Sequence, residues 1–244
     1  MPQPLPLFAT FASAFDLLWK NRLVVGQAVF FAGMVKGIAV WLAFDAFEPM
    51  TATWAQVLLS LFVYTLLAIA VHRQLLQPEK SFVLSQWPGF GMRFLGWVFA
   101  LYLCFSLSLF GVFQIVEVFY KLPPGFYTDW GKLALLVIGG LPGAYLGARI
   151  AVLLPSAALG LGRRVAWAWS LTRGNGWRLV MVLWLLPLIV SKLIPNFSVE
   201  NPALYVLLSI AVSAVTAFEV ALLSVVFREM GGLDTPTQTE SVTV

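Results

Sequence analysis

The sequence predicts an all-α integral membrane protein, a bundle of six transmembrane helices with amphipathic interfacial helices at its cytoplasmic side. Of the 244 residues, 60% are hydrophobic and only 11% are charged, whereas about a quarter of the residues of a soluble domain carry a charge. Apolar runs recur along the chain, and each is close to the roughly 20 residues that cross a bilayer as a helix. We therefore predict one transmembrane domain over residues 1–230 and a polar, disordered tail over residues 231–244.

An amphipathic helix is expected at the start of the chain. Its apolar residues recur at helical spacing: Phe8, Phe11, Phe15 and Leu18. Asp16 and Lys20 are four residues apart on another face, where they can form an ion pair. The segment is too polar to cross a membrane, so we expect it to lie in the interface.

Six apolar runs follow as predicted transmembrane helices. They cover residues 23–44, 54–71, 94–119, 132–154, 177–194 and 203–227. Further interfacial helices are expected near residues 82–86 and over residues 163–173, where aromatic and polar residues are mixed. The sequence Gly174-Asn175-Gly176 ends the second of these, and Asn175 is placed to cap the helix that follows.

The basic residues orient the predicted helices. Ten lie at one set of connections: Lys20, Arg22, Arg73, Lys80, Arg93, Arg163, Arg164, Arg173, Arg178 and Arg228. Three lie near the other set: Lys121, Lys132 and Lys192. Cytoplasmic connections carry the excess of Lys and Arg, so we predict that both termini are cytoplasmic.

Small residues line one face of the fourth predicted helix. Gly139, Gly143 and Gly147 are spaced four apart, and small residues at this spacing let two helix backbones approach closely in lipid. We predict that this helix packs at the centre of the bundle. The spacing does not decide whether the packing is within one chain or between two copies.

Four charged residues lie within or near predicted spans: Lys36, Glu117, Arg149 and Glu219. An ionised side chain at the bilayer centre costs about 2.5–3.5 kcal/mol on insertion scales, so it should find a partner. Arg149 and Glu219 lie at similar predicted depths, and we expect them to form an ion pair, with Lys36 as the competing partner. Such a pair could be a proton or ion relay, but a structural role is favoured because a relay usually needs more than one carboxylate.

Basic residues of the 163–178 segment are candidates for binding lipid head groups. On a helix, Arg163, Ser170 and Arg173 share one narrow arc, and tryptophans occupy the rest of its surface. With Arg178, these residues could contact the phosphates of anionic lipids at the cytoplasmic face. The alternative is that the helix serves only as an interfacial anchor.

Catalytic and metal sites find no support in the sequence. His72, expected at the lipid interface, is the single histidine, and Cys104 is the single cysteine, so neither a Ser-His-Asp triad nor a His-based zinc site can be assembled. We predict no enzymatic activity, no cofactor and no nucleic-acid partner. The expected partners are anionic membrane lipids, and a homo-oligomer or another membrane protein is possible.

One segment resembles a known family. Arg149, Leu154-Pro155 and the run from Ala166 through Ser170-Leu171-Thr172 and Gly174 to Trp177-Arg178 are similar to the pattern of YciC-like proteins and of the glycerophosphoryl-diester phosphodiesterase membrane domain. The resemblance implies a bacterial multi-pass inner-membrane protein in envelope maintenance, and it does not imply hydrolysis. A non-enzymatic role in membrane homeostasis, or as a membrane scaffold, is therefore expected. The alternative is a small transporter or lipid-handling protein with a polar cavity lined by Lys36, Arg149 and Glu219.

Overall fold

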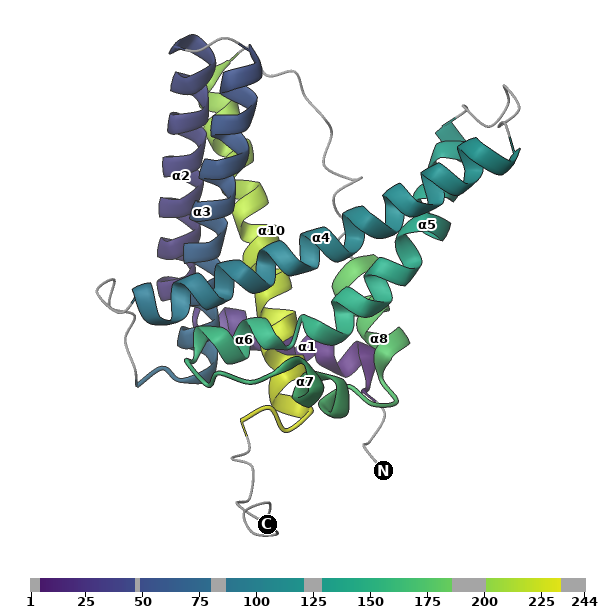
Figure 1. The fold of residues 1–244 in the computed structure, drawn as a ribbon. Coiled ribbons are helices and arrows are strands. Elements are labelled where there is room, and N and C mark those ends of the chain that lie inside the picture. The colour runs from purple at the N-terminus through teal and green to yellow at the C-terminus, as the bar shows by residue number, and fades with distance from the viewer. Residues whose placement is uncertain (1–4, 47–48, 80–86, 121–128, 186–200, 234–244) are drawn as a thin grey trace.

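The computed structural model describes residues 5–46, 49–79, 87–120, 129–185 and 201–233. Every regular element in these residues is helical, which confirms the all-α class. The elements are α1 Leu7–Lys20, α2 Arg22–Ala46, α3 Pro49–Leu76, α4 Trp87–Tyr120, α5 Asp129–Ile150, α6 Leu153–Ala158, α7 Val165–Leu171, α8 Gly176–Val180, the π-helix η3 Met181–Leu185, and α10 Pro202–Glu229 (Figure 1).

Five helical segments are long and apolar enough to cross a membrane. They are Arg22–Leu42, Ala55–Leu76, Gly91–Gly111, Ile138–Ala158 and Ala203–Glu229. They coincide with five of the six predicted spans. The fifth predicted span begins as the short apolar helix Gly176–Leu185, and its remaining residues lie outside the described part of the chain. The interfacial helix expected at residues 82–86 also lies outside it, as does most of the predicted tail.

Helices α2, α3 and α10 lie side by side and form one arm of the molecule, while α4 and α5 form a second arm that diverges from it (Figure 1). Glycines bring α2 and α10 close together. A Cβ atom added at Gly33 would lie 2.5 Å from the Cα of Ile210, and one at Gly37 would lie 2.8 Å from the Cα of Val206. These two glycines have the four-residue spacing of a helix-packing motif, although they were not among the predicted packing residues.

The predicted glycine face of α5 packs inside the chain. A Cβ atom at Gly143 would lie 2.7 Å from the carbonyl oxygen of Cys104 in α4. One at Gly147 would lie 2.9 Å from the Trp184 indole in η3. The carbonyl of Gly139 accepts a hydrogen bond of 2.6 Å from Ser108, again in α4. The structure thus places the three glycines against neighbouring helices of the same chain.

Ser108 also forms hydrogen bonds with the backbone of α5 next to a proline. Its hydroxyl donates to the Gly139 carbonyl and accepts a bond of 3.0 Å from the Gly143 amide. Pro142 lies between these two residues within α5 and has no amide hydrogen to donate. A side-chain hydroxyl that bonds to the backbone at such a place is one way in which membrane helices tolerate proline.

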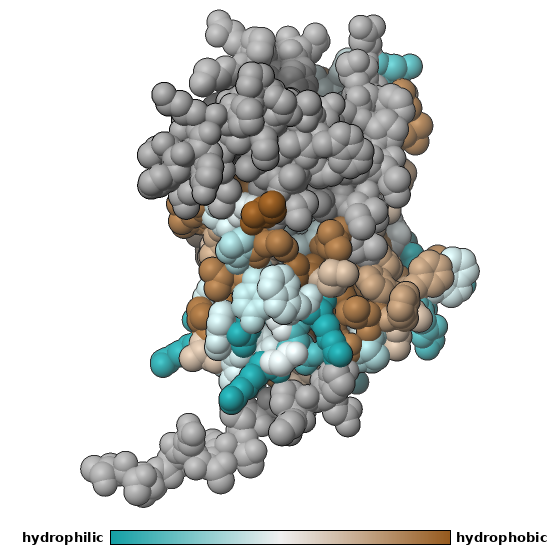
Figure 2. Space-filling view, turned by 90° about the vertical axis from the view of Figure 1, so that its right-hand side faces the viewer, coloured by the Kyte–Doolittle hydropathy of each residue, from teal (hydrophilic) through white to brown (hydrophobic). Residues whose placement is uncertain are grey.

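Helices α1, α6, α7 and α8 gather at one end of the molecule, together with the C-terminal end of α10 (Figure 1). We call this the basal end. Figure 2 shows hydrophilic residues at the lower part of one face, with apolar side chains above them. Asn175 lies here at the start of α8, but its side chain makes no bond to the amides of that helix. Its Oδ1 instead accepts a hydrogen bond of 2.9 Å from the Leu5 amide, which ties the N-terminal segment to the loop before α8.

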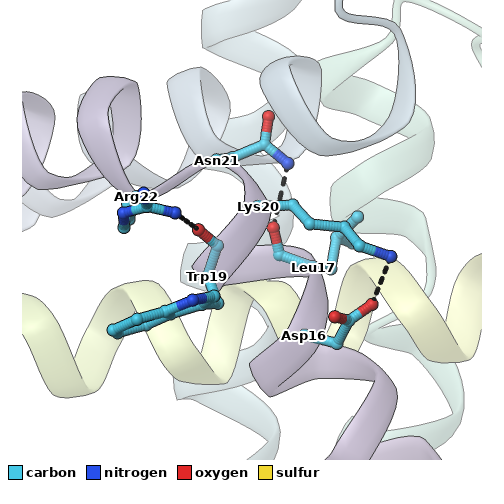
Figure 3. A network of polar contacts seen from close by, with 6 residues as sticks. All are labelled: Asp16, Leu17, Trp19, Lys20, Asn21 and Arg22. Atoms are coloured by element: carbon cyan, nitrogen blue, oxygen red, sulfur yellow. Dashed lines mark hydrogen bonds and ion pairs between the residues drawn. The ribbon is translucent and has the colours of Figure 1, made fainter.

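Short polar contacts join α1 to α2 (Figure 3). The predicted ion pair between Lys20 and Asp16 is present, with 2.6 Å between Nζ and Oδ2. Asn21 donates to the Leu17 carbonyl at 2.9 Å, and Arg22 donates to the Trp19 carbonyl at 3.1 Å. These side chains add donors at the last turn of α1, where backbone amides of the cap also bond to the Leu17 and Trp19 carbonyls.

Candidate functional site

A pocket of about 450 Å³ lies at the basal end between α4 and α6. We call it the basal pocket. Its wall includes two arginines, Arg93 from α4 and Arg163 from the loop before α7, together with Ser156 from α6 and the indole of Trp97. The two guanidinium groups and the hydroxyl are hydrogen-bond donors, whereas the rest of the wall is largely apolar.

Two glycines shape the loop that carries Arg163. Gly160 and Gly162 have φ angles of 74° and 63°, values that a side chain makes costly for any residue but glycine. A Cβ atom at Gly162 would also lie 3.3 Å from Nη1 of Arg93. Glycine therefore allows both the turn after α6 and the close approach of the Arg93 guanidinium to this loop.

Ser156 is the buried polar group of the basal pocket. The residue is 1% exposed, and its Oγ has no hydrogen-bond partner in the structure. A buried hydroxyl without a partner costs about 1–3 kcal/mol, so such groups usually mark the place of a ligand or a bound water. Two guanidinium groups beside a free hydroxyl suit an anion, and arginine is the side chain best matched to phosphate oxygens.

The predicted head-group residues are not all brought together. Arg163 lines the basal pocket and also lies over the Trp167 ring, with 5.2 Å between its Cζ and the ring centroid. Ser170 uses its hydroxyl to donate to the Trp167 carbonyl at 2.8 Å. Arg173 is exposed and Arg178 half-buried, and neither lines the basal pocket.

Two members of the basal pocket were missed by sequence reasoning. Arg93 was recognised only as a basic residue that opens a span, and Ser156 was not singled out. The order of residues along the chain does not show that α6 turns back against the start of α4, so no signal links positions 93 and 156.

Arg149 joins α5 to the end of α7. This side chain is only 7% exposed. Its Nε donates to Thr172 Oγ1 at 2.9 Å, and its Nη2 donates to the Trp169 carbonyl at 2.6 Å. Thr172 in turn donates to the Ala168 carbonyl at 2.8 Å. A cation at the C-terminus of a helix is favourable because the unpaired carbonyls there carry partial negative charge.

The three charged residues predicted to meet inside the membrane form no ion pair with one another within the described residues. Because Arg149 bonds to Thr172 and Trp169, the predicted ion pair with Glu219 is not formed. Lys36 does not take the place of Arg149 as the partner of Glu219. Its Nζ donates to Tyr64 Oη at 2.5 Å and lies 4.4 Å from the centroid of the Tyr64 ring.

Glu219 lines a second cavity of about 370 Å³, enclosed mainly by α3, α4, η3 and α10. We call it the central cavity. His72 also lines it and is completely buried, which corrects the expectation that this residue lies at the lipid interface. Its burial follows from the packing of α3 against α10, where the ring Nδ1 lies 2.8 Å from Ser224 Oγ.

The contacts of Ser224 indicate which nitrogen of His72 carries a hydrogen. The Ser224 hydroxyl donates to the Val220 carbonyl at 2.9 Å, so its only hydrogen is used. Nδ1 of His72 must then donate to Ser224, because a hydroxyl has a single hydrogen. Nε2 is left as an acceptor, and it is buried without a partner in the structure.

Neither cavity resembles a metal centre. Within the described residues, no group of three or more His, Cys, Asp or Glu side chains could hold a metal ion. The chemistry that the two cavities offer is binding, of an anion in the basal pocket and of a ligand with positive charge or donor groups in the central cavity.

Comparisons with known proteins do not assign the chain to a family. No family model, no curated protein and no solved structure matches the chain. The similarity of residues 149–178 to YciC-like proteins therefore stays a prediction.

Proposed function

We propose that this chain is a non-enzymatic multi-pass protein of the bacterial inner membrane that binds anionic lipid head groups at the cytoplasmic face and contributes to membrane homeostasis. The observation that carries the proposal is the basal pocket, in which Arg93 and Arg163 flank the unpartnered hydroxyl of Ser156. A phosphate group fits these donors because each guanidinium can donate two parallel hydrogen bonds and the hydroxyl can donate one more.

The orientation of the protein follows from its charges in this proposal. The basal end carries the termini of α1, α3 and α10 that hold Lys20, Arg73 and Arg228. By the positive-inside rule this end is cytoplasmic. The segment 177–194 supplies the sixth span, so that both chain termini lie on the same side.

Helix α1 is assigned to the membrane interface. It exposes three aromatic side chains, with Phe8 90%, Phe15 62% and Trp19 60% exposed. The Lys20–Asp16 pair lies on the same helix and is exposed as well. A helix with aromatic residues on its surface and charges near one end suits the boundary between acyl chains and head groups.

Anionic lipids are favoured over zwitterionic ones because the surroundings of the pocket are basic. Arg164 lies next to Arg163 and is exposed at the same end of the molecule. Each Lys or Arg near an anionic membrane surface contributes about 1 kcal/mol of attraction. The pocket arginines add specific bonds to this general attraction, and Trp97 offers an apolar wall beside the head group.

The test measures lipid retained by the purified full-length protein. Native mass spectrometry in a mild detergent should show phosphatidylglycerol or cardiolipin bound in preference to phosphatidylcholine. Arg93→Gln and Arg163→Gln should each remove most of this bound lipid. Arg164→Gln is the matched control, because it removes the same charge from an adjacent residue that does not line the pocket. If all three variants lose the same amount of bound lipid, the lipid is attracted to the basic surface in general and the proposed pocket site is wrong.

A small transporter or lipid-handling protein is the second candidate function. One observation favours it: Glu219 faces the central cavity in the apolar part of α10. A cavity lined jointly by Lys36, Arg149 and Glu219 is not retained, because only Glu219 of the three is among the described residues that line the central cavity. A scaffold for another membrane protein, or a homo-oligomer, is the remaining alternative, and native mass spectra of the same preparation report the number of copies directly.

A further inference from the structure

We infer that the central cavity binds a lipophilic cation, for which the carboxylate of Glu219 provides the opposite charge. The inference is independent of the head-group proposal, since it rests on a different cavity and on different residues. It concerns the part of the molecule where α3 and α10 face α4 and η3.

One face of α3 and one face of α10 build most of the wall. On α3 the lining residues include Tyr64, Ala68 and His72, spaced four apart along one side of the helix. Eight residues separate the first from the last, which is about 12 Å at 1.5 Å per residue. On α10, Glu219 lies next to Val220 on the side that faces these residues. The cavity is therefore elongated along α3, and the carboxyl group belongs to its wall.

Glu219 has no hydrogen bond or ion pair within the described residues, although it lies deep in a span. It stands ten residues before the last residue of α10, Glu229, which is about 15 Å along the helix. A carboxylate at such depth costs several kcal/mol unless a partner compensates it. The two cationic side chains predicted as partners of Glu219 bond to other residues. Lys36 bonds to Tyr64, and Arg149 bonds to Thr172 and Trp169.

Aromatic rings also favour a cation. Phe94 and Trp184 line the cavity, and the faces of such rings attract positive charge, worth about 0.5–2 kcal/mol depending on desolvation. The free Nε2 of His72 adds a further acceptor to the same wall. None of the described lining residues is Lys or Arg, and the Lys36 ammonium, which reaches the lining residue Tyr64, is bonded to the hydroxyl of that tyrosine.

The remaining wall is apolar and selects for a lipophilic ligand. Leu61, Val98, Leu101 and Leu183 are among its members. A small hydrated cation would lose its water shell in such surroundings and would meet only one carboxylate in return. An organic cation with rings or an alkyl chain keeps its apolar contacts and pairs its charge with Glu219, so its desolvation cost is lower.

The test compares two probes of nearly the same shape and opposite charge. Full-length protein in phosphatidylcholine nanodiscs is dialysed to equilibrium against tetraphenylphosphonium or tetraphenylborate, with empty nanodiscs to subtract partitioning into lipid. We expect saturable binding of one tetraphenylphosphonium per chain and no saturable binding of tetraphenylborate. Quenching of Trp184, read as the signal lost in Trp184→Phe, should follow the same curve.

Glu219→Gln should weaken tetraphenylphosphonium binding by at least about tenfold, equivalent to roughly 1.4 kcal/mol. Glu229→Gln is the matched control on the same helix, because Glu229 accepts a hydrogen bond from Thr10 at 3.0 Å outside the cavity, and this variant should bind as the unmodified chain does. Ala68→Leu should also reduce binding by filling the cavity, without any change of charge.

Several outcomes would overturn the inference: equal binding of both probes, unchanged affinity in Glu219→Gln, or equal loss in Glu229→Gln. Size-exclusion profiles and melting temperatures of all variants separate loss of binding from loss of fold. Because Ala68→Leu keeps the carboxyl group, it tests the cavity even if removal of the acid disturbs the helix. Arg93→Gln should leave cation binding intact, so failure of the head-group proposal would not be confused with failure of this one.

Discussion

The guanidinium carbon of Arg149 lies 3.6 Å from the centroid of the Trp169 indole, and the Nη2 of the same group donates to the carbonyl of the same residue. One side chain thus contacts both the ring and the backbone of Trp169. Together with the bond from Nε to Thr172, this holds the C-terminal end of α7 against the end of α5. The segment that resembles a known family is therefore held together by its first arginine.

Arg149→Lys should destabilise the protein although it keeps the charge. An ammonium group cannot reproduce the planar fork that reaches Thr172 and the Trp169 carbonyl together, and a hydrogen bond from a charged group contributes about 1.5–3 kcal/mol. Thermal unfolding in detergent, followed by circular dichroism, measures the loss. Thr172→Ser keeps the hydroxyl and serves as the control with a much smaller effect. Equal melting temperatures for Arg149→Lys and the unmodified chain would show that the contacts contribute little.

Gly33→Ala should disrupt the packing of α2 on α10. The added Cβ would lie 2.5 Å from the backbone of Ile210, and overpacking of this kind typically costs about 1–3 kcal/mol. Gly26→Ala is the matched control on the same helix, because a Cβ there meets nothing within 4 Å. It should be neutral or slightly stabilising, since alanine is the better helix former. If both variants melt at the same temperature, the close approach at Gly33 is not a tight constraint.

Ser108→Ala should weaken the contact between α4 and α5. It removes the hydroxyl that bonds to the Gly139 carbonyl and the Gly143 amide beside Pro142. Hydrogen bonds inside membrane helix bundles contribute on average about 0.6 kcal/mol and at most about 1.7 kcal/mol, so a modest fall in stability is expected. Ser106→Ala on the same helix is the comparison. A larger fall for Ser106→Ala than for Ser108→Ala would contradict the assigned role.

A reporter enzyme that is active only outside the cytoplasm should be inactive when fused to either terminus. This follows from the positive charge at the basal end and from the proposed total of six spans. A fluorescent protein that folds only in the cytoplasm should give signal at the same two positions. Activity of the first reporter at one terminus alone would indicate an odd number of spans, and at both would reverse the orientation.

The positions of the apolar helices were predictable because hydropathy is a local property. The run from Ala203 to Phe227, for example, lies within α10 as the structure has it. Side-chain partners depend instead on how distant helices meet. Arg149 and Glu219 were paired by depth alone, whereas α7 folds back so that Thr172 reaches Arg149 first. His72 was placed at the interface because Arg73 follows it, yet the face of α3 that carries His72 is covered by α10.

The glycine motifs likewise show that a packing face can be predicted from local sequence, whereas the helix that covers it cannot. The spacing of Gly139, Gly143 and Gly147 indicated a packing face but not its neighbour, since a helix surface does not specify which helix covers it. Gly33 and Gly37 carry an equally plain spacing and could have been found by the same reasoning. The basal pocket could not be predicted from such spacing, because Arg93 and Ser156 come together only through the turn between α5 and α6.

The hydrogen bonds from the start of the chain have a consequence for biosynthesis. Leu5 bonds to Asn175, and Thr10 bonds to Glu229 at the end of α10. The segment around α1 therefore makes these two contacts with residues that are translated long after it. Docking of α1 is thus coupled to the synthesis of α10, and a nascent chain that stops before residue 202 lacks the helix against which α1 packs.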